Sequence, residues 1–130
     1  MNAYRLNKLW WFFGFLGMAI ITGGSLMPSE PGPEWIPHVD KAVHFTGYFI
    51  STFYFQQLTK NQKPILIFIL LFSYSGAIEI AQDFFPTRQM SLLDLIANGL
   101  GALCGSLLSI KILKDFLSRI DRILSDRLIH

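Results

Sequence analysis

Four long stretches of apolar residues, separated by short polar segments, dominate the chain. They cover about residues 9–27, 42–58, 64–85 and 92–110. A helix needs roughly 20 apolar residues to cross the hydrocarbon core of a bilayer. The stretches are continuous rather than alternating, which favours helices over the strands of a membrane barrel. The pattern therefore predicts an all-α integral membrane protein, a four-helix bundle with four transmembrane helices.

The segments between these stretches are polar and rich in helix-breaking residues. Residues 28–38 contain four prolines, residues 59–63 form a short polar turn, and residues 86–91 begin with a proline. Proline cannot continue a helix, so these segments are expected to be loops. The first stretch has a rival interpretation as a signal peptide, but an A-x-A-like cleavage site is not evident, and we expect a transmembrane helix.

The last segment of the chain has a different pattern. From residue 113 onward, apolar side chains fall on one helical face and charged side chains on the opposite face. This pattern predicts an amphipathic helix that lies on the membrane surface, or, as the alternative, binds a partner. The chain is thus expected to consist of a four-helix transmembrane domain, 1–112, and a C-terminal amphipathic helix, 113–130.

Composition supports a membrane protein and excludes several other classes. Of the 130 residues, 52% are hydrophobic and only 15% are charged, against roughly 25% charged in an average soluble domain. The net charge of +2 is too small to indicate a nucleic-acid partner. A single cysteine allows neither an internal disulfide nor a cysteine-based zinc site. We expect no cofactor, no metal and no nucleic acid, with the lipid bilayer as the main partner.

The distribution of lysine and arginine predicts the orientation of the helices. Nine of the eleven such residues lie in the N-terminal tail, the second loop and the C-terminal segment, and the other two are Lys41 and Arg88. Loops rich in positive charge remain in the cytoplasm. We therefore expect a multi-pass protein of the cell membrane with both termini cytoplasmic and the first and third loops outside.

Polar side chains gather toward the outer end of three predicted helices. The candidates are Asp40, Lys41, His44 and Tyr48 in the second helix, Glu79 and Gln82 in the third, Arg88 and Ser91 in the following loop, and Asp94 and Asn98 in the fourth. Spacings of three and four residues place the members from each helix on one face. A charged group that faces lipid costs a few kcal/mol at the helix centre, so we expect the three faces to meet in one polar layer.

Most of these residues also have a structural interpretation. Ser91 is a candidate N-cap of the fourth helix, with Asp94 in its first turn. Asp40 and Lys41 can extend toward the membrane surface as interfacial side chains. Glu79 is the hardest to explain in this way, because a long apolar run precedes it, and its candidate partners are Arg88, Lys41 and His44.

The fourth helix carries a stripe of small residues at a spacing of four. Ala97, Gly101 and Gly105 form this stripe, which predicts a close approach to a neighbouring helix. We expect Cys104, in the same helix, to be buried and inert.

Two motifs resemble those of the VanZ-like family of membrane proteins. Asp40-Lys41-x-x-His44-Phe45-x-x-Tyr48-Phe49 looks like the first signature, and Glu79-Ile80-x-Gln82 followed by Arg88-x-x-Ser91-x-x-Asp94-x-x-x-Asn98-x-x-Gly101 looks like the second. The resemblance covers roughly residues 39–105 and implies a four-helix membrane domain. It also implies a link to resistance against the antibiotic teicoplanin, with which the founding members are associated.

Three functions remain open at this stage. The first is a polar pocket at the outer leaflet that binds a lipid head group, a cell-wall precursor or an amphiphilic antibiotic, and contributes to teicoplanin resistance or envelope homeostasis. The second is a membrane-embedded enzyme for a lipid-linked substrate, with His44 as general acid or base, although the sequence has no recognisable catalytic motif. The third is a polar layer that only fixes helix register. The oligomeric state does not follow from the sequence.

Overall fold

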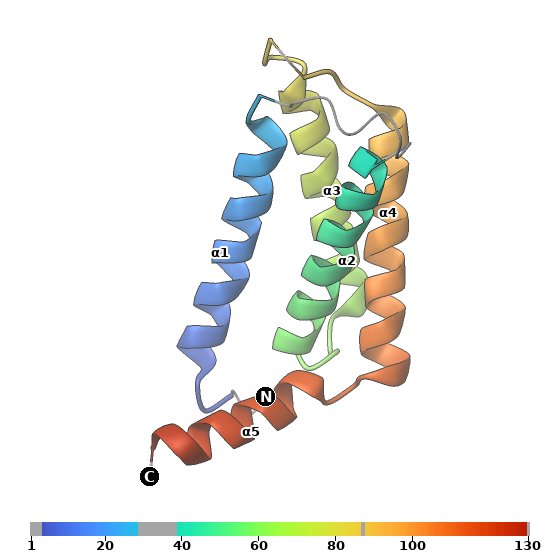
Figure 1. Cartoon of the computed structure of the whole chain (residues 1–130). Helices are drawn as coiled ribbons and strands as arrows, with labels where there is room; N and C mark the ends of the chain where they lie inside the picture. Colours follow the sequence, from blue (N-terminus) through green and yellow to red (C-terminus); the bar gives the residue numbers. More distant parts are fainter. Residues whose placement is uncertain (1–3, 29–38, 87, 130) are drawn as a thin grey trace.

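The computed structural model describes residues 4–28, 39–86 and 88–129. Over these residues all the regular secondary structure is helical. Its elements are α1 (Asn7–Leu26), α2 (Val39–Leu58), α3 (Pro64–Gln82), α4 (Leu92–Leu107), the short π-helix η1 (Leu108–Ile112) and α5 (Phe116–Leu128). Helices α1 to α4 run along a common direction, and α5 crosses the lower end of the molecule (Figure 1). The prediction of an all-α fold is confirmed, while most of the predicted loop 28–38 lies outside the described residues.

Three helices are long and apolar enough to cross a membrane. They are α1, α3 and the continuous segment Leu92–Ile112. Helix α2 contacts α1, α3, α4 and α5, and its polar side chains are buried among them, including Ser51, Thr52 and Gln56. These polar groups lower the mean hydropathy of α2, so α2 is not among the helices that are long and apolar enough to cross a membrane. The sequence-based prediction of four spans is therefore supported for three helices.

Local sequence explains where the helices begin and end. Pro64 occupies the first turn of α3, where its missing N–H removes no helical hydrogen bond. In the turn between α2 and α3, Lys60 and Asn61 adopt positive φ angles of 53° and 58°. Asparagine tolerates this left-handed conformation better than most residues, which suits a tight reversal of the chain. At the start of α4, the Ser91 hydroxyl accepts a hydrogen bond from the backbone N–H of Asp94 at 3.2 Å. The expected N-cap is thus confirmed.

Helices α2 and α4 pack with their backbones in close contact. A Cβ atom at Gly101 would overlap with the carbonyl oxygen of Phe45, and one at Gly105 would overlap with the carbonyl oxygen of Phe49. Only glycine allows this approach, so the small-residue stripe is a packing surface, as its spacing predicts. Cys104 lies on the exposed side of the same helix, so the expectation of a buried thiol is wrong. This packing holds the polar ends of α2 and α4 against each other.

Helix α5 docks onto the N-terminal segment through a buried carboxylate. Asp121 accepts hydrogen bonds from Trp10 Nε1 at 2.7 Å and from the backbone N–H groups of Leu6 and Arg5, each at 3.0 Å. Burial alone would raise the pKa of Asp121, but these hydrogen bonds and the charge of Arg5 outweigh it and hold the pKa below its ordinary value. The polar face of α5, which the helical pattern places opposite its apolar face, is therefore partly buried against the protein.

A second polar layer at the lower end ties α2 to the chain after α4. The Gln57 side chain donates to the Ser109 hydroxyl at 2.8 Å and to the Leu113 carbonyl at 2.7 Å, and it accepts from the backbone N–H of Leu117 at 3.1 Å. One side chain thus satisfies backbone groups of the irregular segment between η1 and α5. The polar atoms of the Gln57 side chain thus all have partners, whereas the Oε1 atom of the neighbouring Gln56 has none among the described residues.

Candidate functional site

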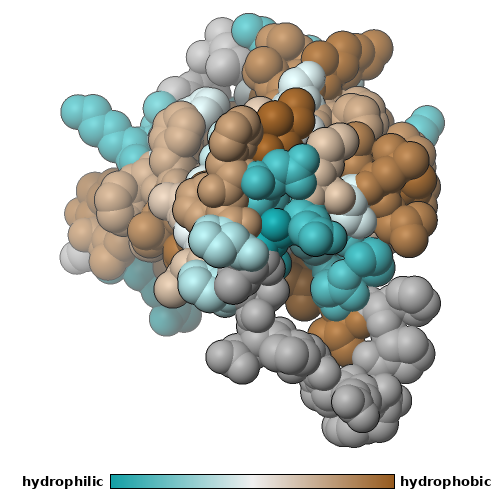
Figure 2. Space-filling model, turned by 90° about the horizontal axis from the view of Figure 1, so that it is seen from above, coloured by the Kyte–Doolittle hydropathy of each residue, from teal (hydrophilic) through white to brown (hydrophobic). Residues whose placement is uncertain are grey.

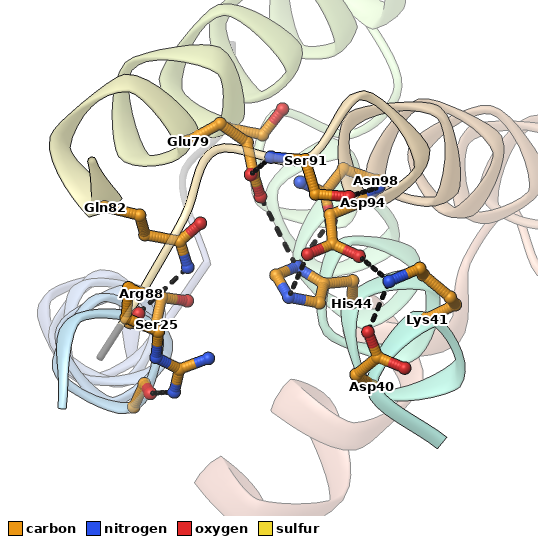
Figure 3. Close-up of polar contacts among 12 residues, drawn as sticks. Ser25, Asp40, Lys41, His44, Glu79, Gln82, Arg88, Ser91, Asp94 and Asn98 are labelled. Atoms are coloured by element: carbon orange, nitrogen blue, oxygen red, sulfur yellow. Dashed lines mark hydrogen bonds and ion pairs between the residues drawn. The ribbon is translucent and has the colours of Figure 1, made fainter. Parts of the chain in front are cut away.

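Five polar side chains from three helices meet at the upper end of the bundle, where α2 and α4 begin and α3 ends. This upper polar cluster consists of Lys41, His44, Glu79, Asp94 and Asn98, and Figure 3 shows them directed toward one another. A view onto the same end shows a group of hydrophilic side chains flanked by hydrophobic ones (Figure 2). The helical spacing in the sequence predicts this convergence, because each helix presents its polar face to the others.

His44 lies at the centre of the upper polar cluster. Its Nδ1 atom lies 3.1 Å from Asn98 Oδ1, and its Nε2 atom lies 3.5 Å from Asp94 Oδ2. If the amide oxygen of Asn98 accepts a hydrogen bond from His44, the hydrogen is on Nδ1. In a neutral ring, Nε2 then has a lone pair, which is directed toward the carboxylate of Asp94. This contact is favourable only with a proton or another cation between the two atoms.

Glu79 is a buried carboxylate with an unused acceptor. Its side chain is 1% exposed. Its Oε2 atom accepts a hydrogen bond from the backbone N–H of Ser91 at 3.1 Å. Its Oε1 atom has no hydrogen-bond partner among the described residues and lies 3.9 Å from His44 Nδ1. A buried polar atom without a partner carries a desolvation penalty of about 1–3 kcal/mol. Amide and hydroxyl oxygens of Gln56 and Thr52 also lack partners among the described residues, but the penalty is larger for a charged carboxylate, so Glu79 is the stronger sign of a binding site.

The positive charge in the upper polar cluster comes from Lys41. Its Nζ atom lies 2.7 Å from Asp94 Oδ1 and also pairs with Asp40. The side chain of Lys41 is 26% exposed and that of Asp40 is 59% exposed, so these two residues form the rim. Of the three carboxylates at this end, Lys41 thus pairs with those of Asp94 and Asp40 and not with that of Glu79. The upper polar cluster has an excess of negative charge and of hydrogen-bond acceptors.

Arg88 and Gln82 bind the end of α1. Arg88 donates from Nε to the Met27 carbonyl at 2.9 Å and from a terminal nitrogen to the Gly24 carbonyl at 3.0 Å. Gln82 donates to the Ser25 carbonyl at 2.9 Å. The last carbonyl groups of a helix have no hydrogen-bond donors within the helix, and the side chains of Arg88 and Gln82 provide donors for those of α1. Arg88 was a candidate partner of Glu79 in the sequence, but its guanidinium is used here, in the separate group of contacts seen in Figure 3.

The comparison with known families agrees with the motifs. A model of the VanZ/LLP1 family matches residues 3–114. The chain belongs to the VanZ/LLP1 family. No curated protein and no solved structure matches it. The matched range includes every residue of the upper polar cluster, and the resemblance drawn from the sequence motifs is confirmed.

Three other positions complete the upper end of this VanZ/LLP1 protein. Tyr48 is buried one turn below His44, and its hydroxyl has no hydrogen-bond partner among the described residues. Asp83 accepts a hydrogen bond from the backbone N–H of Met90 at 2.6 Å and so shapes the loop after α3. Ser91 is a helix cap whose own N–H holds Glu79. Tyr48 is therefore the remaining candidate for ligand contact, while Asp83 and Ser91 position the backbone.

The upper polar cluster of the VanZ/LLP1 protein also has the donor set of a metal site. His44, Glu79 and Asp94 each offer one ligand atom, and these atoms lie within 4.8 Å of one another. The sequence gives no sign of this arrangement, because a metal-binding motif normally places two ligands close together in one segment. Here each ligand comes from a different helix, so only the packing of α2, α3 and α4 brings them together.

Proposed function

We propose that this VanZ/LLP1 protein binds the polar head group of an amphiphile at the upper polar cluster. The observation that carries the proposal is the unused Oε1 atom of Glu79, a buried acceptor that lies beside His44. At the lower end the Gln57 side chain satisfies its hydrogen bonds within the protein, while the Oε1 atom of Gln56 beside it has no partner among the described residues. Glu79 differs from Gln56 in carrying a negative charge, which makes an unpaired buried acceptor more costly. A head group that donates hydrogen bonds would supply the missing partner.

The excess of carboxylates limits the chemistry of the ligand. Asp40, Glu79 and Asp94 repel a bare phosphate, while Lys41 already pairs with two of them. Sugar hydroxyls and amino groups are donors and fit this environment. Amphiphiles with such head groups include glycolipids, lipid-linked cell-wall precursors and lipid-tailed glycopeptide antibiotics. By holding such a molecule, the protein would contribute to teicoplanin resistance or to envelope homeostasis.

The proposal places the upper end at the outer leaflet. Nine of the eleven lysines and arginines belong to segments at the opposite end, which supports a cytoplasmic location for that end and for both termini. Helix α2 then serves as the fourth span. Its buried polar side chains are shielded from lipid by α1, α3 and α4, so its modest hydropathy is no obstacle to crossing.

A second function, catalysis on the bound amphiphile, is favoured by one contact. His44 has an amide oxygen at one ring nitrogen and a carboxylate at the other, an arrangement that holds an imidazole in place for proton transfer. Under this alternative His44 would exchange a proton with the substrate while Asn98 and Asp94 position its ring. Chemical change of a bound amphiphile, seen by mass spectrometry, would separate catalysis from binding alone.

Thermal unfolding in phosphatidylcholine nanodiscs tests the proposed binding. The probes are an alkyl glycoside, an alkylamine and an alkyl phosphate with the same tail. The glycoside or the amine is expected to raise Tm of the wild type, because ligand at a hundredfold excess over Kd stabilises a protein by about 2.7 kcal/mol. The alkyl phosphate, in the presence of a chelator, is expected to have no effect.

Two variants complete this experiment. Glu79→Gln removes the negative charge and replaces one of the two carboxylate oxygens with an NH2 donor, so it should abolish the shift. Asp83→Asn changes a carboxyl at the same end that holds the loop backbone and should retain it. Equal shifts in the wild type and in Glu79→Gln would show that the probes act through the bilayer and would contradict the proposal.

A further inference from the structure

The two buried carboxylates of the upper polar cluster are held in the same way. Asp94 has Oδ1 against Lys41 Nζ at 2.7 Å, and Glu79 has Oε2 against the backbone N–H of Ser91 at 3.1 Å. In each carboxylate one oxygen is thus fixed by a protein donor. The other oxygens lie near different nitrogens of the His44 imidazole: Asp94 Oδ2 is 3.5 Å from Nε2, and Glu79 Oε1 is 3.9 Å from Nδ1.

The ring of His44 is held as metal-binding histidines are held. A histidine that binds a metal through one nitrogen usually donates its other N–H to a carbonyl or carboxylate oxygen, which fixes the tautomer and the ring orientation. His44 Nδ1 lies 3.1 Å from the amide oxygen of Asn98. This hydrogen bond leaves the lone pair of Nε2 directed toward Asp94 Oδ2.

The spacing of the three groups suits a single ion. The three ligand atoms lie within 4.8 Å of one another. Bonds of about 2.0–2.2 Å to zinc place two ligands of the same ion roughly 3–4.4 Å apart. Binding of an ion would therefore draw the three side chains closer together. The unused Oε1 of Glu79 is the independent sign of a ligand, because its side chain is almost fully buried and its charge is not balanced by Lys41, which pairs with Asp94 and Asp40.

We propose that His44, Glu79 and Asp94 bind one divalent transition-metal cation, Zn²⁺ or Mn²⁺. One imidazole and two carboxylates suit these ions, because imidazole nitrogen is a weak choice for Mg²⁺ or Ca²⁺. The cation offsets the excess of negative charge and offers an open coordination position to an oxygen atom of a ligand. This proposal stands on the geometry of the three side chains and does not depend on the binding of an amphiphile.

Metal analysis of the purified full-length protein tests the proposal. The detergent-solubilised wild type is stripped with a chelator, dialysed against Zn²⁺, Mn²⁺ or Mg²⁺, desalted, and measured by inductively coupled plasma mass spectrometry. The expected result is one equivalent of Zn²⁺ or Mn²⁺ per chain and no retained Mg²⁺. Glu79→Gln and Asp94→Asn should each lose at least nine-tenths of the bound metal, while Asp83→Asn retains it.

The outcomes that overturn the proposal are equally clear. They are wild-type protein without stoichiometric metal, equal retention of Mg²⁺, or a folded Glu79→Gln variant that binds as the wild type does. Should the variants fail to fold, X-ray absorption of the zinc-loaded wild type decides, since the proposal requires one imidazole with oxygen ligands and no sulfur. Metal binding without any probe-induced Tm shift would support this proposal and contradict the proposed function. A probe-induced Tm shift in a protein that binds no metal would support the proposed function and contradict this proposal.

Discussion

Arg88 and Met27 are joined by a hydrogen bond of 2.9 Å from the guanidinium Nε to the backbone carbonyl oxygen. The same guanidinium also reaches the carbonyl of Gly24 at 3.0 Å. These two bonds fasten the end of α1 to the loop between α3 and α4. A residue of the family motif therefore has a structural explanation that needs no ligand.

Replacing Arg88 with alanine should destabilise the protein without affecting the upper polar cluster. Loss of two hydrogen bonds from a charged, partly exposed donor is expected to lower the free energy of unfolding by about 1–2 kcal/mol. The neighbouring exposed variant Gln89→Ala is the matched control and should unfold like the wild type. Thermal unfolding in detergent measures both, and an unchanged Tm in Arg88→Ala would contradict this role.

Adding a single methyl group to Gly101 should disrupt the packing of α2 against α4. The new Cβ would overlap with the backbone carbonyl of Phe45, which cannot move as a side chain can. We expect Gly101→Ala to lose about 3 kcal/mol or more of stability, at the upper end of overpacking effects. Gly17→Ala is the control, since a Cβ there meets no atom within 4 Å. Similar Tm values for the two variants would show that the helices can separate freely.

Asp121 should make the stability of the protein depend on acid pH. Its pKa in the folded protein lies below the ordinary value of 3.8, because hydrogen bonds from Trp10, Leu6 and Arg5 outweigh the effect of burial. The ionised carboxylate therefore stabilises the folded form above about pH 4. This contribution is lost as the pH falls through the lowered pKa.

The variant Asp121→Asn isolates this effect. It should lower the free energy of unfolding by about 2 kcal/mol near neutral pH, since its amide cannot replace a charged acceptor of several bonds. It should also show a weaker loss of stability than the wild type as the pH falls below about 4. Asp126→Asn, which changes an exposed carboxyl on the same helix, should behave like the wild type. Parallel pH profiles of wild type and Asp121→Asn would refute the assignment.

The sequence predicts the positions of the helices and most of the upper polar cluster. Helical spacing shows which face of each helix is polar, and the cost of charge in lipid requires these faces to point toward one another. Both can be read from the sequence of a single helix, and together they predict that His44, Glu79 and Asp94 meet. They do not predict the partner of Arg88. Arg88 lies in a loop, where no helical periodicity fixes the direction of its side chain. The carbonyl groups that it binds are more than sixty residues away in the sequence.

The lower end shows a second limit of sequence patterns. The amphipathic pattern of α5 identifies Asp121 as polar but cannot tell whether it faces water or another protein group. Its partner Trp10 is 111 residues distant. Likewise, Gln57 lies beside Gln56 at the end of α2, and only the irregular backbone after α4 explains why Gln57 is buried. Such contacts depend on tertiary packing rather than on local pattern.

Labelling of single cysteines tests the proposed orientation. In a Cys104→Ser background, Gln89→Cys places a thiol in the exposed loop after α3, and Gln62→Cys places one in the exposed turn after α2. A membrane-impermeant maleimide should label position 89 in intact cells and position 62 only after permeabilisation. Labelling of position 62 alone in intact cells would reverse the orientation and place the upper polar cluster at the cytoplasmic leaflet.

Native mass spectrometry of the protein released from detergent tests most directly whether the upper polar cluster is a binding site. The account predicts that the wild type and Asp83→Asn retain a co-purified amphiphile as a discrete mass increment. Glu79→Gln, shown to be folded by a cooperative unfolding transition, should lack this increment because the buried carboxylate charge is gone. The same increment in folded Glu79→Gln, or none in the wild type, would contradict the account and leave the upper polar cluster as a helix-packing device.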